Sequence, residues 1–181
     1  LSVEAKRFIA GLLKHAPEIT ILTNQWVNSY KRLTPGYEAP VYLSWALRNR
    51  SDLIRIPVYR YGQEHATRIE YRAPDPACNP YLAFSVILAA GLEGIKKKYD
   101  PIPPVERNVY EMTDEERKKK GIGSLPGNLF EALELAEKST LVRETLGDHV
   151  FDKFIENKKI EWDNYRTQVT DYEIKRYLPI L

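Results

Sequence analysis

The sequence predicts an α+β fold, in which antiparallel strands carry an arginine-lined face and are packed by helices. Three patterns support this prediction. Apolar residues recur at helical spacing before Pro17, they alternate with polar residues between positions 41 and 72, and capped helical patterns follow residue 79. Blocks of strands and helices that are segregated along the chain are typical of the α+β class.

The composition fits one globular domain or a large piece of a longer protein. The chain has 181 residues, of which 43% are hydrophobic and 29% are charged, so it can bury a core. Its net charge of +2 gives no general attraction to nucleic acid or to anionic membranes. The single cysteine, Cys78, excludes an internal disulfide framework.

Targeting signals are absent from the sequence as given. The longest apolar-rich run, Tyr81 to Leu92, is shorter than the ~18 residues that a membrane span needs. No signal-peptide pattern is present, so we expect a cytoplasmic protein. The first residue is Leu1 and the helical pattern begins at once, which indicates a fragment or a trimmed product.

The first predicted helix begins behind a Ser2 cap and is expected to stop at Pro17. Period-two alternation then predicts three antiparallel strands with one buried face, within residues 41–48, 53–60 and 67–72. Pro57 cannot donate a ladder hydrogen bond, so its strand is expected at an edge or beside a bulge.

Helices are predicted for most of the remaining chain. Asn79 is a good N-cap with Pro80 at the first helical position, and the helix that follows is apolar nearly all round, so we expect it to be the most buried helix. Residues 113–116 form a capping box for a short polar helix ending at Gly121. Further helices are predicted over residues 128–137, 139–146, 148–166 and 170–177.

Arginines collect on the predicted strands. Alternation places Arg68, Glu70 and Arg72 on one face. It also places three more arginines opposite apolar neighbours: Arg48, Arg50 and Arg55. Because arginine recognises carboxylates and phosphates through paired donors, this face is expected to attract such anions. Two interpretations of Glu70 stay open: an ion-pair partner of its neighbours, or an oxygen ligand for Mg²⁺. A charged face that only meets solvent is a third possibility.

The loop before the strands resembles a lid. Arg32 precedes the turn-forming pair Pro35-Gly36, and Glu38 follows it. A flexible turn with opposite charges on its flanks, next to an arginine-lined sheet, is typical of a loop that closes over a charged site. An ordinary surface loop with an ion pair is the alternative.

Three long motifs closely resemble type I glutamine synthetase. They are NSYKRLTPGYEAP, RNRSDLIRIP and TRIEYRAPDPACNPYLAFSVILAAGLEGIK, and they occur in the order and spacing of that family. The resemblance extends over essentially the whole chain. It implies that residues 1–181 are the C-terminal portion of the catalytic domain, without its upstream portion and the N-terminal domain.

The resemblance also implies roles for individual residues. Arg32 and Arg72 would hold the carboxylates of the glutamate substrate, and Glu38 would close the site and help to deprotonate ammonium. Arg50 would contact the transferred phosphate as well as substrate. Two arginines would lie in the nucleotide site, Arg55 and Arg68, and Glu70 would bind Mg²⁺ or Mn²⁺. The segment between these two arginines departs from the family, and Arg60 is only a candidate for its further nucleotide contact.

The implied activity is glutamine biosynthesis. In this family, ATP phosphorylates L-glutamate to a γ-glutamyl phosphate, and ammonia displaces the phosphate. The implied assembly is two stacked hexameric rings, with the terminal segment YEIKRYLPIL as a strap into the opposite ring. A terminal helix packed on its own core is the alternative. Because Glu70 is the only convincing metal ligand, we expect the isolated chain to be inactive.

Other readings remain open at this point. A relative that joins glutamate to another amine would share these motifs, and a non-catalytic structural homologue could keep the fold. Binding of nucleic acid is not expected, because Glu38 and Glu70 lie among the basic residues. Tyr110 resembles a position that some enterobacterial members adenylylate, but the residues after it depart from that pattern, so a packing role is expected.

Overall fold

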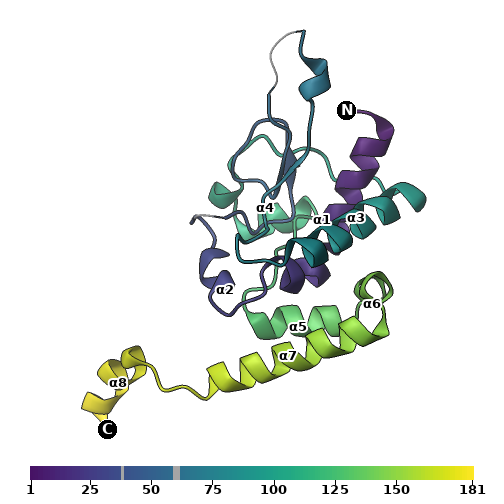
Figure 1. The fold of residues 1–181 in the computed structure, drawn as a ribbon. Coiled ribbons are helices and arrows are strands. Elements are labelled where there is room, and N and C mark those ends of the chain that lie inside the picture. Colours follow the sequence, from purple (N-terminus) through teal and green to yellow (C-terminus); the bar gives the residue numbers. More distant parts are fainter. Residues whose placement is uncertain (38, 59–61) are drawn as a thin grey trace.

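The computed structural model describes residues 1–37, 39–58 and 62–181 (Figure 1). Two long helices, α1 (Val3–Thr23) and α3 (Pro80–Lys96), lie side by side at the centre. A small sheet with its loops lies on one side of this pair, and a layer of later helices lies on the other. This arrangement of strands and helices confirms the predicted α+β class.

Helix α1 continues through Pro17, so the predicted end at that residue is wrong. Proline removes one helical hydrogen bond, which costs about 3 kcal/mol in an exposed helix. Here the last turns carry Ile19, Ile21 and Leu22, whose side chains are fully buried, and this burial outweighs the missing bond. The Ser2 cap is confirmed, because its hydroxyl accepts the N–H of Ala5.

Glycines allow α1 and α3 to approach closely. A Cβ atom at Gly11 would collide with the carbonyl oxygen of Ala90, and one at Gly94 would collide with the carbonyl oxygen of Arg7. Both collisions involve backbone atoms, which cannot move aside as a flexible side chain can. The contact between the two helices therefore depends on residues without a side chain.

Helix α3 begins as predicted, with the Asn79 side chain accepting the N–H of Tyr81 at 3.0 Å. The prediction that it is the most buried helix is wrong. Its small residues face α1, whereas its large apolar residues form an exposed stripe: Tyr81, Phe84, Leu88 and Leu92. The sequence could not show this, because an all-apolar helix has no polar face to mark its exposed side.

The sheet is shorter and more mixed than predicted. Its strands β1 (Trp45–Ala46), β2 (Ile54–Arg55) and β3 (Glu70–Tyr71) lie in the order β1-β2-β3. β2 and β3 are antiparallel, but β1 and β2 are parallel, so the predicted wholly antiparallel sheet is wrong. The segment 41–43 pairs with residues 123–125 instead of extending β1.

Side chains of the β1–β2 connection explain the parallel pairing. Asn49 donates to the carbonyl oxygens of Val105 at 3.2 Å and Arg107 at 2.8 Å. The hydroxyl of Ser51 accepts the N–H of Val109 at 3.0 Å. These bonds hold the connection against residues 105–109, so the chain makes a wide loop there instead of a hairpin turn.

The remaining helices are α2 (Ser29–Arg32), η1 (Glu64–Ala66), η2 (Val109–Glu111), α4 (Asp114–Lys119), α5 (Leu129–Glu137), α6 (Thr140–Leu146), α7 (Asp148–Arg166), α8 (Asp171–Tyr177) and η3 (Leu178–Ile180). They include the predicted α4 to α8, together with short helices that were not predicted, α2, η1, η2 and η3. Both predicted capping boxes are confirmed, at Thr113–Glu116 and at Thr170–Glu173. Helix α8 stands apart from the rest at the end of an extended connection (Figure 1). No described helix is both long and apolar enough to span a lipid bilayer.

Candidate active site

The sheet joins three of the predicted site residues. The antiparallel register places Arg55 opposite Glu70. Arg72 lies two residues after Glu70, directly after the end of β3. The Nη2 atom of Arg55 lies 2.7 Å from Oε2 of Glu70, and Nε of Arg72 lies 3.3 Å from Oε1. Both carboxylate oxygens of Glu70 are thus held by guanidinium groups, and the shared face expected from alternation is confirmed for these three residues.

Arg72 also holds the loop that carries Arg50. Its Nη1 atom donates to the carbonyl oxygen of Arg50 and, at 3.3 Å, to that of Asp52. Its backbone N–H donates to the carbonyl oxygen of Leu53 at 3.0 Å. The loop is therefore folded around one guanidinium group, while the side chain of Arg50 remains exposed.

Arg32 reaches the same region from α2. Its Nη2 atom donates to the carbonyl oxygens of Ala73 at 2.5 Å and Pro74 at 3.0 Å, and to Oδ1 of Asn24 at 3.3 Å. Ala73 and Pro74 immediately follow Arg72 in the chain, so these bonds bring Arg32 to the segment that carries the other predicted substrate arginine. Asn24 is fully buried at the end of α1, which fixes one side of this contact.

Other predicted site residues lie outside this cluster. Arg68 precedes β3, is exposed, and donates to the carbonyl oxygen of Ala66 at 3.4 Å. Arg48 is also exposed and lies beyond the end of β1. The strands are only two residues long, so alternation does not extend to these arginines. Glu38 and Arg60 lie outside the described residues.

The turn before Glu38 has the predicted geometry. Gly36 adopts a φ of 77°, a conformation that residues with a side chain rarely take. The N–H of Tyr37 donates to the carbonyl oxygen of Thr34 at 3.1 Å, which closes the turn. On the other side of the loop, the hydroxyl of Tyr110 donates to the carbonyl oxygen of Ala39 at 3.4 Å.

Tyr110 packs against the loop, as expected. Its ring lies 5.9 Å from that of Tyr42, and the guanidinium group of Arg117 covers Tyr42 at 4.3 Å. Burial raises the pKa of the Tyr110 hydroxyl, so it stays protonated and remains a donor to Ala39 at neutral pH. These contacts connect the base of the loop to η2 and α4.

Sequence reasoning missed Asp52. This residue is fully buried, and neither of its carboxylate oxygens has a hydrogen-bond partner among the described residues. Burial, which is opposed by Ser44 and Arg72 and assisted by the charge of Glu106, raises the pKa of Asp52 to about 7. One signal could have found it: Asp52 shares the parity of Ile54 and Ile56, which face the core.

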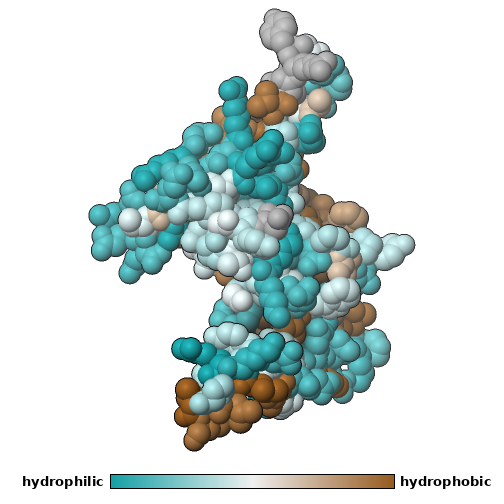
Figure 2. All heavy atoms as spheres, turned by 90° about the vertical axis from the view of Figure 1, so that its left-hand side faces the viewer, coloured by the Kyte–Doolittle hydropathy of each residue, from teal (hydrophilic) through white to brown (hydrophobic). Residues whose placement is uncertain are grey.

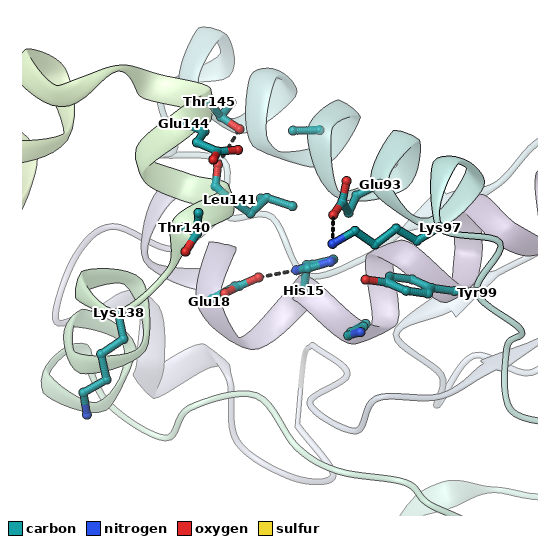
Figure 3. A pocket seen from close by; sticks show the side chains of 12 residues that line it. His15, Glu18, Glu93, Lys97, Tyr99, Lys138, Thr140, Leu141, Glu144 and Thr145 are labelled. Carbon is teal, nitrogen blue, oxygen red and sulfur yellow. Dashed lines mark hydrogen bonds and ion pairs between the residues drawn. The ribbon is translucent and has the colours of Figure 1, made fainter.

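A separate cavity of about 600 Å³ lies between α1, α3 and α6 (Figure 3). Two pairs form among its polar side chains: His15 with Glu18, and Glu93 with Lys97 at 2.7 Å. Lys14 lies over the ring of Tyr99 at 3.9 Å. None of the predicted site residues that the structure describes lines this cavity, so it is distinct from the arginine cluster.

The described residues do not form a metal centre by themselves. Over residues 1–37, 39–58 and 62–181, no group of three or more His, Cys, Asp and Glu side chains could hold a metal ion. Glu70 is the predicted ligand, and both of its oxygens contact guanidinium groups. A cation bound by Glu70 would share this carboxylate with Arg55 and Arg72.

Comparison with known proteins connects this arrangement to a family. The family model described as "Glutamine synthetase, catalytic domain" matches residues 1–177. The chain is 55% identical over 180 residues to glutamine synthetase of Mycolicibacterium smegmatis and 53% identical over 180 residues to that of Methanococcus maripaludis. Each match covers 99% of this chain, which spans 40% of the length of either relative.

A solved structure leads to the same family. The chain is similar to the structure described as "GmaS/ADP complex-Conformation 1", with a TM-score of 0.85 and 34% identity. That match covers 99% of this chain and 40% of the solved one. Agreement in sequence over nearly all of this chain, together with the similar fold, shows that the chain belongs to the glutamine synthetase family.

Proposed function

We propose that the protein containing this chain is an ATP-dependent ligase that makes L-glutamine from L-glutamate and ammonia. The observation that carries the proposal is the pairing of Glu70 with Arg55 and Arg72, beside Arg32 and the loop of Arg50, in a chain that matches glutamine synthetases over nearly its whole length. In this proposal residues 1–181 are the C-terminal portion of the catalytic domain and act in the cytoplasm.

The reaction builds negative charge that arginines can stabilise. The γ-carboxylate of glutamate attacks the γ-phosphorus of ATP, ADP leaves, and a γ-glutamyl phosphate forms. Ammonia then attacks the acyl carbon and expels phosphate. Positively charged donors that are fixed in advance stabilise the charge on phosphoryl and carboxylate oxygens in both steps. Arg72 is such a donor, because Glu70 and two carbonyl oxygens hold its guanidinium group.

The arginines divide the substrates between them. Arg32 and Arg72 would bind the carboxylates of glutamate, and Arg50, exposed on its loop, would contact the transferred phosphate. Arg55 and Arg68 would contact ATP. Nucleotide binding is supported by the similar solved structure described as an ADP complex. Glu38 would close the site behind the turn at Gly36, because the acyl phosphate must be kept from water.

The resemblance implies Mg²⁺ or Mn²⁺ as well, and Glu70 would be its ligand. The described residues offer this single carboxylate and pair it with Arg55 and Arg72, so they do not fit a complete metal site. Further ligands would have to come from the rest of the relatives' length, which this chain does not span. We therefore assign no step of the reaction to the metal here.

One assay tests the proposal. We expect the full-length protein to form glutamine from glutamate, ammonium and ATP when Mg²⁺ is present, and to release one phosphate for each glutamine. The 181-residue chain alone should form none, because its described residues offer no ligand set for the metal. Preference for methylamine over ammonium would show a glutamate–amine ligase instead. Absence of both products would contradict the proposed activity, and glutamine formation by the chain alone would contradict its dependence on the upstream portion.

The C-terminal segment supports the proposed assembly into two hexameric rings. Every residue from 163 to 181 is exposed, including Tyr177, Leu178, Ile180 and Leu181. Figure 2 shows apolar surface gathered at the end of this segment. A packed terminal helix would bury such side chains on its own chain, but this one does not. The segment therefore has the composition and exposure of a strap that another subunit covers.

A further inference from the structure

Asp52 lies beneath the arginines of the proposed site. It sits between Arg50, whose carbonyl oxygen accepts from Arg72, and Leu53, whose carbonyl oxygen accepts the N–H of Arg72. Its own carbonyl oxygen also accepts from Arg72, at 3.3 Å. The residue is fully buried, so its carboxyl group does not lie on the surface that meets substrate.

The carboxyl group of Asp52 has an unusual environment. Neither oxygen has a hydrogen-bond partner, and no cation lies within ion-pair distance, among the described residues. Burying an unpaired carboxylate is costly, and a protein normally avoids the cost by keeping such a group protonated. At this position a neutral acid is therefore favoured until the pH approaches neutrality.

Four groups on different elements face this carboxyl group. The hydroxyl of Ser44, before β1, favours the ionised form, and so does Arg72 at the end of β3. Glu106, on the loop beside β1, disfavours it, and this side chain is fixed because it accepts the N–H of Leu47 at 2.9 Å. Tyr110 on η2 is also close enough for the two groups to influence each other, and it stays neutral.

We propose that Asp52 is a positioning residue that sets, through Arg72, how strongly the site holds the carboxylates of its substrate. This rests on the proposed function, because it assigns a substrate to Arg72. When Asp52 is protonated, it adds no negative charge to that of Glu70 beside Arg72, and an anionic ligand meets less repulsion. When Asp52 loses its proton, its negative charge attracts the guanidinium group of Arg72 and repels an anionic ligand, so the ligand is bound less tightly.

The direction of the pH effect follows from this arrangement. Affinity for L-glutamate should fall as the pH rises through about 7, where Asp52 ionises. One added unit charge beside the anion site, in a partly screened environment, changes the dissociation constant of the anion by roughly three- to tenfold. The Asp52→Asn variant keeps the shape of the side chain without its charge and should lack this contribution at every pH.

The test measures the dissociation constant of L-glutamate by calorimetry between pH 6 and pH 8.5, with the full-length wild-type protein and Asp52→Asn. At each pH the dissociation constant of the wild type is divided by that of Asp52→Asn, and this ratio removes titrations that both proteins share. We expect the ratio to be close to one at pH 6 and to rise to roughly three to ten at pH 8.5. A merely structural role would change affinity or stability equally at all pH values, and a constant ratio overturns the proposal.

A second variant keeps the test decisive if Asp52→Asn does not assemble. Glu106→Gln can still accept the N–H of Leu47 but removes the charge that keeps Asp52 protonated. Its glutamate affinity should therefore fall at lower pH than in the wild type, and an unmoved midpoint overturns the assignment of the titration to Asp52. Glutamate binding without glutamine formation would contradict the proposed function alone, and an absence of binding would contradict both.

Discussion

At the scale of single residues, the candidate site depends on guanidinium groups that hold one carboxylate and several carbonyl oxygens. Arg72 makes three of these contacts: Nε with Glu70, and Nη1 with two carbonyl oxygens. A planar fork with fixed donor directions can make them simultaneously. A lysine has the same charge but donates from a single atom, so it cannot keep Glu70 and the loop of Arg50 in place together.

The first prediction concerns this difference. In the full-length protein, Arg72→Lys should lower kcat/KM for glutamate by roughly a hundredfold or more, because a fixed donor to the reacting anion is lost. Steady-state kinetics with varied glutamate would measure the change. The matched control is Arg166→Lys on α7, where an exposed ion pair with Asp163 lies far along the chain from the site. Equal kinetics for both variants would contradict the role proposed for Arg72.

The second prediction concerns stability and follows from the raised pKa of Asp52. The folded protein binds this proton more tightly than the unfolded chain, whose aspartates titrate near 3.8. The resulting stability is fully present below pH 3.8 and is lost as the pH rises to about 7. Three pKa units correspond to at most about 4 kcal/mol.

Thermal unfolding at several pH values would measure this loss. Asp52→Asn should raise the melting temperature relative to wild type by a larger amount at pH 8 than at pH 5. Asp163→Asn is the control, because Asp163 is exposed and its removal should give a small difference at both pH values. A Tm difference between Asp52→Asn and wild type that is the same at pH 5 and pH 8 would contradict the buried, unpaired state of the Asp52 carboxyl group.

Sequence patterns predicted part of this site for a clear reason. Alternation placed Glu70 and Arg72 on one face, and the register of β2 with β3 added Arg55. Alternation failed for Arg68, because β3 begins only at Glu70 and side chains alternate between two faces only within a strand. The burial of Asp52 was overlooked because this acid, in a segment rich in arginine, was considered only as part of the local net charge. The role of Glu38 stays a prediction.

At the scale of elements, the starts of several helices were predictable because nearby residues in the sequence cap them. Ser2, Asn79, Thr113 and Thr170 all cap helices through their side chains, as expected. Pro17 was misleading, since tertiary burial outweighed the local cost of proline. The parallel pairing of β1 with β2 could not be predicted, because it depends on bonds from Asn49 to residues more than fifty positions away.

The third prediction tests the contact between α1 and α3. Gly94→Ala should destabilise the protein by at least about 2 kcal/mol, because the new Cβ atom would meet the backbone of Arg7 and force the helices apart. Chemical denaturation and soluble yield would measure the effect. Gly127→Ala is the control, since its Cβ atom would make only an ordinary contact with Glu131, at 3.5 Å. Equal stability of the two variants would contradict the close helix contact.

At the scale of the whole molecule, two apolar surfaces have no cover within the described chain. One is the stripe on α3 that includes Phe84 and Leu88, and the other is the terminal segment after α7. The overall composition could not reveal either surface, because hydrophobic content says how much can be buried and not which residues find a partner. Both surfaces fit a chain that spans 40% of the length of its relatives.

The last prediction concerns the terminal segment as a strap between rings. Deletion of residues 177–181 from the full-length protein removes Tyr177, Leu178, Ile180 and Leu181, all of which are at least half exposed. If these side chains are buried in the opposite ring, the deletion should convert double rings into single hexamers while leaving the helices intact. Each large apolar side chain that loses its cover costs about 1.5–3 kcal/mol, so the loss per subunit is large enough to separate the rings.

Light scattering coupled to size-exclusion chromatography would distinguish double from single rings. Lys175→Ala is a suitable control, because it changes a polar residue of α8 without removing apolar surface. Circular dichroism would show whether the deletion variant keeps its helices. Intact double rings after the deletion would mean that the segment does not hold the rings together, and its exposed side chains would then need another partner.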